Sequence, residues 1–158
     1  MIGRFREELA KLADKKKAKI LQRFFKTGKG EYGEGDVFLG INVPTSRKLA
    51  IMFKDLSFSE ITELLKSKIH EERLIGLLIL VHNFSQRDKQ KQIFEFYLDN
   101  TKYINNWDLV DLSADKIVGS YLFARQDRGS SILLDFARSK NLWERRIAMI
   151  ATYYFIKN

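Results

Sequence analysis

Hydrophobic residues recur at helical spacing along most of the chain. Residues 3–25 place apolar side chains at helical spacing, residues 71–84 are strongly apolar from Leu74 to Val81, and residues 87–100 repeat the period. Such spacing gathers apolar side chains on one face of a helix, where they can be buried. Pro44 and a cluster of glycines interrupt the pattern only within residues 26–44, so the chain is predicted to be all-α.

Local signals indicate where the predicted helices break and begin. Within residues 3–25, the basic run at residues 15–19 separates two groups of apolar positions and is interpreted as a solvated face. Pro44 suits the first turn of a helix, because its missing N–H is not needed there. Ser57 followed by Glu60 matches a capping box, which predicts a helix continuing to about Ser67.

The glycine-rich loop at residues 26–36 contains the spacing G-x-G-x-x-G at positions 28, 30 and 33. A dinucleotide-binding fingerprint must follow a strand and open a helix, whereas this one follows a helix and opens a loop. It is therefore interpreted as a connector. The next run, Val37 to Val43, resembles a strand but has no second strand to pair with, so packed extended chain is expected.

Two distant segments repeat one another in register. Residues 67–76 and 139–148 share Ser, Lys, Glu, Arg and Ile at an offset of 139 − 67 = 72 positions, which is twice 36. Trp107 lies midway, since 143 − 107 = 36. A period near 36 residues predicts stacked helix pairs, and no tetratricopeptide pattern is present, so a HEAT-like helical-repeat solenoid is expected.

The stretch from Asn105 to Asp111 carries the most suggestive side chains. In a helix, Trp107 and Asp111 are four positions apart and share one face. An indole and a carboxylate side by side are typical of a binding surface, but they are also typical of a packed aromatic residue and a helix cap. The repeat favours the first interpretation, because it predicts that Trp107, Asp111, Trp143 and Arg146 gather on one concave surface.

The charge balance narrows the class of partner. The 158 residues include 28 Lys and Arg against 20 Asp and Glu, a net charge of +8. This balance favours a polyanionic partner, with an acidic protein surface or simple solubility as alternatives. With no cysteine and two distant histidines, His70 and His82, neither a disulfide nor a metal site is expected, and the reaction implied by the resemblance described below requires no cofactor.

No targeting signal is recognised in the sequence. No apolar run reaches membrane-spanning length, and the first residues lack the apolar region of a signal peptide. A cytoplasmic location is expected, with no membrane partner.

Three segments resemble a known family. Tyr103–Asp111, Asn141–Ala148 and Gly40–Leu49 are similar to the AlkD-type DNA alkylation repair family, the HEAT-like-repeat DNA glycosylases. The resemblance extends from about residue 20 to the end of the chain. It implies a curved solenoid with a concave basic face and a partner that is double-stranded DNA containing alkylated bases.

The resemblance also implies roles for individual residues. The second acid of Trp-Asp-x-Val-Asp falls on Asp111 as the catalytic carboxylate, and its aromatic partner falls on Trp107. Arg146, three positions after Trp143, matches the arginine that contacts the DNA backbone near the lesion. Arg145 and Lys140, in the same element, complete the DNA-binding set together with Trp143.

The family pattern continues beyond what this sequence contains. Family members have further helical repeats, including a second tryptophan of the catalytic cleft that has no counterpart here. Residues 1–158 are therefore expected to form a single HEAT-like repeat domain that is the incomplete N-terminal portion of a longer family domain. Association through the exposed end of the array is also expected.

The implied reaction is hydrolytic excision of cationic N3- or N7-alkylated purines from duplex DNA without base flipping. Asp111 would stabilise an oxocarbenium-like sugar, Trp107 would present its π face, and Arg146 would hold a phosphate. When bound to DNA, the protein would be associated with the nucleoid. Two alternatives remain: a non-catalytic HEAT-like DNA-binding protein, and a helical-repeat scaffold for an acidic protein.

Overall fold

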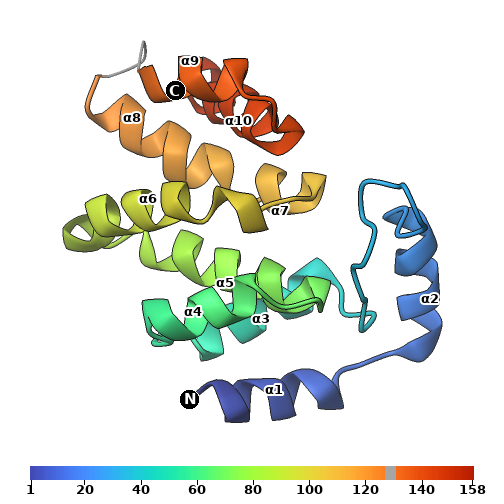
Figure 1. The fold of residues 1–158 in the computed structure, drawn as a ribbon. Helices are drawn as coiled ribbons and strands as arrows, with labels where there is room; N and C mark the ends of the chain where they lie inside the picture. Colours follow the sequence, from blue (N-terminus) through green and yellow to red (C-terminus); the bar gives the residue numbers. More distant parts are fainter. Residues whose placement is uncertain (127–130) are drawn as a thin grey trace. The chain divides into compact units, whose positions relative to one another are not determined.

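The computed structural model describes residues 1–126 and 131–158, and its regular structure is helical (Figure 1). Within those residues no strand forms, and the only β-type pairing is an isolated bridge between Val37 and Ile69. The all-α prediction is confirmed. The part of that prediction that covers residues 127–130 lies outside the described residues. Among the described helices, none combines the length and apolarity needed to cross a membrane.

The chain divides into two compact units, residues 1–82 and 83–158. The helices of the first unit, with α5 reaching the boundary, are α1 (Ile2–Lys11), α2 (Lys15–Phe24), α3 (Val43–Met52), α4 (Phe58–Leu65) and α5 (His70–Asn83). The second unit contains η1 (Arg87–Lys89), α6 (Gln90–Asp99), η2 (Thr101–Tyr103), α7 (Trp107–Asp111), the π-helical turn η3 (Asp115–Gly119), α8 (Ser120–Ala124), α9 (Ser131–Arg138) and α10 (Leu142–Lys157).

Side-chain caps set the starts of α2 and α4. Asp14 accepts hydrogen bonds from the backbone N–H groups of Lys16 and Lys17, so the basic run opens α2. The helical pattern predicted across residues 3–25 is thus interrupted between α1 and α2, before the basic run. At α4 the capping box is confirmed, since Ser57 and Glu60 exchange side-chain to backbone hydrogen bonds.

The core of the first unit is built on α5, which is buried along most of its length. Ile75 and Ile79 are fully buried, as predicted for this apolar segment. The ring of Phe5, from α1, packs edge-to-face against Phe53 at 5.4 Å between ring centroids. Burying aromatic and aliphatic side chains of this size contributes about 1.5–3 kcal/mol each.

The predicted extended segment lies between the glycine-rich loop and α3, and a buried carboxylate holds it in place. Glu71 accepts hydrogen bonds from the backbone N–H groups of Leu39, Gly40 and Ile41, at 3.0, 2.8 and 3.2 Å. Gly40 has φ +88°, and a Cβ there would collide with the carbonyl oxygen of Asp14. Glycine is required because the chain passes this close to the start of α2.

Helix α10 organises the second unit. It packs against α7, α8, α9 and η3, with Ile147 and Ala151 fully buried. Gly119, the last residue of η3, allows the two backbones to touch, since a Cβ there would collide with the Ala151 carbonyl oxygen. The opposite side of α10 leaves Met149, Tyr153 and Ile156 exposed. The expected association of the chain through such a face stays a prediction.

The two copies of the sequence repeat begin their helices in register. Helix α5 starts at residue 70 and α10 at residue 142, an offset of 142 − 70 = 72. Ser67 Oγ accepts a hydrogen bond from Ile69 N at 3.0 Å, and Ser139 Oγ accepts one from Asn141 N at 3.0 Å. The similarity in sequence therefore corresponds to the same local turn before the helix in each unit.

Candidate functional site

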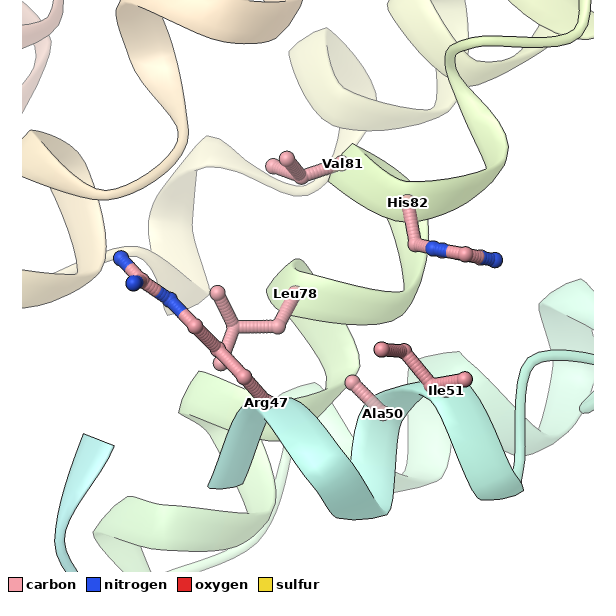
Figure 2. Close-up of a pocket in the computed structure, with 6 residues that line it drawn as sticks. All are labelled: Arg47, Ala50, Ile51, Leu78, Val81 and His82. Carbon is pink, nitrogen blue, oxygen red and sulfur yellow. The ribbon is translucent and has the colours of Figure 1, made fainter. Parts of the chain in front are cut away.

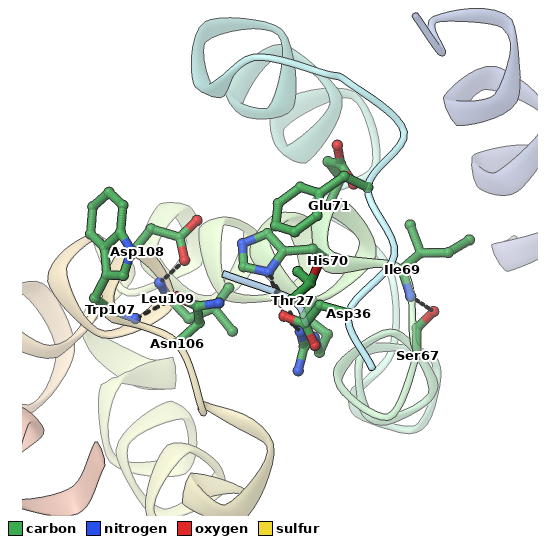
Figure 3. A network of polar contacts seen from close by, with 12 residues as sticks. Thr27, Asp36, Ser67, Ile69, His70, Glu71, Asn106, Trp107, Asp108 and Leu109 are labelled. Carbon is green, nitrogen blue, oxygen red and sulfur yellow. Dashed lines mark hydrogen bonds and ion pairs between the residues drawn. The ribbon is translucent and has the colours of Figure 1, made fainter. Parts of the chain in front are cut away.

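The Trp-Asp-x-Val-Asp stretch forms the short helix α7, and two polar side chains set its start. Asn106, which is fully buried, accepts a hydrogen bond from the backbone N–H of Trp107 at 2.8 Å. Asp108 is also buried and accepts one from the N–H of Leu109 at 2.8 Å (Figure 3). The negative charge of an acid in the first turn is also stabilised by the positive end of the helix dipole. The capping interpretation therefore describes Asn106 and Asp108, and Asp111 lies at the other end of α7.

Asp111 pairs with Arg146 in a two-point contact between α7 and α10. Arg146 Nε donates to Asp111 Oδ1 at 2.8 Å, and Arg146 Nη2 donates to Asp111 Oδ2 at 2.7 Å. The hydrogen bond to Asp111 raises the pKa of Arg146 above its ordinary value. The side chains of Asp111 and Arg146 remain 31% and 38% exposed, so the pair is accessible from solvent. Bidentate pairs of this kind fix orientation as well as charge.

The geometry leaves Arg146 with donors to spare. A guanidinium has five N–H donors, and only one on Nε and one on Nη2 are directed at Asp111. The remaining donors can bind an anion while the bond to Asp111 persists. The site can therefore hold a carboxylate in a fixed orientation and receive a phosphate at the same time.

Two buried hydroxyl groups, those of Ser113 and Tyr97, are hydrogen-bonded next to the end of α7. Ser113 Oγ donates to the carbonyl oxygen of Leu109 at 2.5 Å, and the Tyr97 hydroxyl lies 3.0 Å from Ser113 Oγ. Tyr97 is fully buried, and this burial raises the pKa of its phenol well above the usual range. Sequence reasoning missed both residues. The available signal was the i, i+4 spacing of Ser113 from Leu109, which is typical of a hydroxyl bonding back to a helix carbonyl.

The start of α10 is fixed by a second polar cluster. Asn141 caps the helix by accepting from the N–H of Trp143 at 2.9 Å. Glu144 accepts from Thr101 Oγ1 at 3.1 Å and from Ser139 Oγ at 2.5 Å. These bonds tie the first turn of α10 to η2. Glu144 was not predicted, although it is one of the residues that recur in the sequence repeat.

The remaining predicted residues lie on the same two helix starts. Trp107 is the first residue of α7 and Trp143 the second of α10, and both are half-buried. Arg145 folds back onto the preceding turn, where its Nη1 donates to the Ser139 carbonyl at 2.8 Å. Lys140 is exposed in that turn. Within the predicted set, direct hydrogen bonds join Asp111 to Arg146.

The first unit contains a small hollow that the sequence did not indicate. It has a volume of about 190 Å³ and lies between α3 and α5 (Figure 2). Its lining is apolar at Ile51, Leu78 and Val81, with Arg47 and His82 at its edges. The described residues that line it include one permanent cation, Arg47, and no acid.

The first unit also contains a buried ionic cluster beneath the glycine-rich loop. Asp36 forms an ion pair with Arg73, and His70 Nδ1 lies 3.1 Å from Asp36 Oδ2 (Figure 3). Burial acts to raise the pKa of Asp36, but the hydrogen bond from His70 and the charge of Arg73 outweigh it, and the pKa is lowered. Phe38 stacks on His70 at 4.4 Å between ring centroids. The cluster thus holds Asp36, the last residue of the glycine-rich loop, in place and stabilises the fold at this point.

Across the residues that the structure describes, no group of three or more His, Cys, Asp or Glu side chains is placed to hold a metal ion.

Comparison with known proteins gives one finding. A family model described as DNA alkylation repair enzyme matches residues 5–158. No curated protein and no solved structure matches the chain.

Proposed function

Since the chain belongs to the DNA alkylation repair enzyme family, we propose that it hydrolyses the N-glycosidic bond of cationic N3- and N7-alkylated purines in duplex DNA. The observation that supports this most strongly is the Asp111 carboxylate, which is partly exposed and oriented by two hydrogen bonds from Arg146. A fixed, accessible carboxylate beside a cation with spare donors is what cleavage next to a DNA phosphate needs.

The chemistry follows from the charge of the substrate. An alkylated purine carries a positive charge, so it departs as a neutral base with the bonding electrons when the bond to the sugar C1′ breaks. The sugar becomes oxocarbenium-like, and Asp111 stabilises that charge and orients the attacking water. Water adds to C1′ and its proton passes to the solvent, which leaves the sugar with a hydroxyl at C1′. Trp107, at the other end of α7, offers its π face to the electron-poor sugar and the cationic base.

Arg146 would link the reaction to the DNA backbone. Its donors that are not directed at Asp111 bind a phosphate, so the backbone and the carboxylate are held by one group. Trp143, Arg145 and Lys140, at the start of α10, would extend the contact along the strand. We propose that a helical-repeat array with a concave basic face grips the duplex from outside and leaves the lesion in the stack, with no organic cofactor or metal ion. A cytoplasmic, nucleoid-associated location follows from this partner.

Replacement of Asp111 by Asn tests the proposal directly. Release of 7-methylguanine from methylated duplex DNA should fall by about 100-fold or more, because the amide cannot stabilise the developing positive charge. Binding to undamaged duplex should change little. Asp135→Asn, which removes the same charge from the exposed surface of α9, serves as the matched control. Thermal unfolding verifies that both variants fold, and an unchanged release rate in Asp111→Asn contradicts the assignment.

One observation favours a second candidate, a non-catalytic duplex-binding protein. Both oxygens of Asp111 accept from Arg146, as in an ion pair that serves only to join two helices. This candidate predicts duplex affinity that falls steeply with salt and no release of base. The scaffold for an acidic protein predicts neither salt-dependent duplex affinity nor release of base.

A further inference from the structure

Helix α2 differs from the other described helices of ten or more residues in that it buries none of its side chains. It nevertheless carries Ile20 and Phe24, which are 66% and 61% exposed. Five of its ten residues are cations: Lys15, Lys16, Lys17, Lys19 and Arg23. Lys17 forms an ion pair with Asp14, the acid that caps the helix. A helix of this composition gains little from the core and is held by other means.

Polar and backbone contacts hold one side of α2 against the extended segment. Gln22 donates to the carbonyl oxygen of Asp36 at 2.6 Å and accepts from the N–H of Phe38 at 3.3 Å. The N–H of Asp14 donates to the carbonyl of Leu39 at 2.8 Å, and Gly40 passes beside the backbone of Ala18. The inner side of α2 is therefore the one that carries Ala18 and Gln22.

The helical period then fixes what the outer side presents. At about 100° per residue, Lys16, Ile20 and Arg23 lie opposite Ala18 and Gln22, and Lys19 lies beside them. Lys19, Ile20 and Arg23 line a surface hollow of about 310 Å³. Lys16 and Arg23 are seven residues apart, roughly 10 Å along the helix, which equals about three steps from phosphate to phosphate at a rise of about 3.4 Å each along one DNA strand.

We propose that this surface, Lys16, Lys19, Ile20, Arg23 and Phe24 of α2, is a second contact for the sugar–phosphate backbone of duplex DNA, separate from the Asp111–Arg146 site. The inference rests on the proposed DNA partner and adds to it. Lys16, Lys19 and Arg23 lie within this span of phosphates, and release of the counterions condensed on the phosphates that they contact drives association. Ile20 and Phe24 contact the apolar edges of the deoxyriboses between the phosphates.

The composition of α2 favours a polyphosphate backbone over a lipid surface. A helix that lies in a bilayer interface has a broad apolar face that it buries among the acyl chains. On α2 only two large apolar side chains are strongly exposed, and Lys19 and Arg23 alternate with them along the helix. Such a face cannot be buried in hydrocarbon without also burying charge.

The test uses the whole chain and undamaged duplex DNA, with binding measured by fluorescence anisotropy over a range of salt concentrations. In the triple variant Lys16→Ala, Lys19→Ala, Arg23→Ala, the slope of log affinity against log salt should become shallower by roughly 2.7, at about 0.9 per cation. Because α2 has no buried residue, thermal stability should be little changed. The exchange Lys16→Arg, Lys19→Arg, Arg23→Lys keeps the charge and should keep the slope.

A second triple variant, Lys48→Ala, Arg87→Ala, Lys89→Ala, removes the same charge from exposed positions outside α2 and should change the slope by less. Equal loss in both triple variants overturns the proposal, because net charge alone would explain it. The proposal is also overturned if the α2 triple variant loses binding to phosphatidylserine vesicles but keeps the wild-type salt slope on duplex DNA, because the partner of α2 would then be a membrane. The two proposals can fail separately. The α2 contact is supported if the α2 triple variant has the shallower salt slope, even if Asp111→Asn still releases base. It is contradicted if the α2 triple variant keeps the wild-type slope while Asp111→Asn loses base release.

Discussion

The two copies of the internal repeat, residues 67–76 and 139–148, start their helices in the same way but differ in which side chains they bury. Both have a serine that accepts from the N–H two residues later, both start a helix at the equivalent position, and both bury the same isoleucine, Ile75 and Ile147. In the first copy the position equivalent to Arg146 is Leu74, which is buried. In the second copy that position is a half-exposed cation paired with Asp111.

A second aligned position shows the same change of use. Glu71 is 1% exposed and is occupied with the backbone of the extended segment, whereas its counterpart Trp143 is half-buried on the first turn of α10. The conserved part of the pattern, Glu72 and Glu144, is a carboxylate with hydrogen-bond partners in each copy. The residues shared by the two copies therefore specify how the helix starts. The two positions that differ, Glu71/Trp143 and Leu74/Arg146, decide whether the first turns of the helix are buried in the core or partly exposed at the candidate site.

The largest effect that would test this comparison is expected from Glu71→Ala. It leaves three buried backbone N–H groups without their acceptor, so the free energy of unfolding should fall by about 3 kcal/mol. Urea denaturation measures the change, and Glu7→Ala, at an exposed position of α1, is the control. Unaltered stability would mean that Glu71 does not hold the extended segment.

A smaller effect is expected from Arg146→Ala in the second copy. Duplex affinity should fall across all sequences, and the slope of log affinity against log salt should become shallower by about 1, because one phosphate contact is lost. Arg138→Ala removes an exposed cation from α9 and should leave more of the slope intact. If the Arg146 variant keeps the wild-type slope, Arg146 serves only as the partner of Asp111.

The smallest effect is expected from acid acting on the first unit. Hydrogen bonds from the backbone of Ser57 and from the terminal amine lower the pKa of Glu60 from 4.5 to about 2. Because the pKa of Glu60 is lower in the folded than in the unfolded state, its ionised form stabilises the protein at pH values above the unfolded-state pKa. This stabilisation is lost as the pH falls from about 4.5 towards about 2. Glu60→Gln should flatten this part of the stability profile, and Glu63→Gln should not. Identical profiles for the two variants would exclude the role of Glu60.

Much of the helix pattern could be read from local sequence, because caps and periodicity act over a few residues. The capping box at Ser57, the proline in α3 and the buried helix α5 were predicted on this basis and are present. The break before α2 was not predicted, because apolar residues lie at helical spacing on both sides of it and the capping role of Asp14 was overlooked.

The site was predicted as a set of residues and not as a geometry. Spacing and resemblance both pointed to Asp111 and Arg146, but a bidentate bond between residues 35 positions apart depends on how α7 packs on α10. The support from Tyr97 and Ser113 is of the same kind, since it joins α6 to the segment after α7. Local rules describe neighbours along a helix, and these contacts arise only from tertiary packing.

The contact at Gly119 has a consequence for how the site tolerates change. Because the backbones of η3 and α10 touch there, α10 cannot slide by one turn, about 5.4 Å, without a collision of main-chain atoms. The distance from Asp111 to Arg146 is thus anchored by the main chain, which substitutions of other side chains do not alter. Substitutions of exposed side chains near Asp111 should therefore leave the spacing between α7 and α10 unchanged.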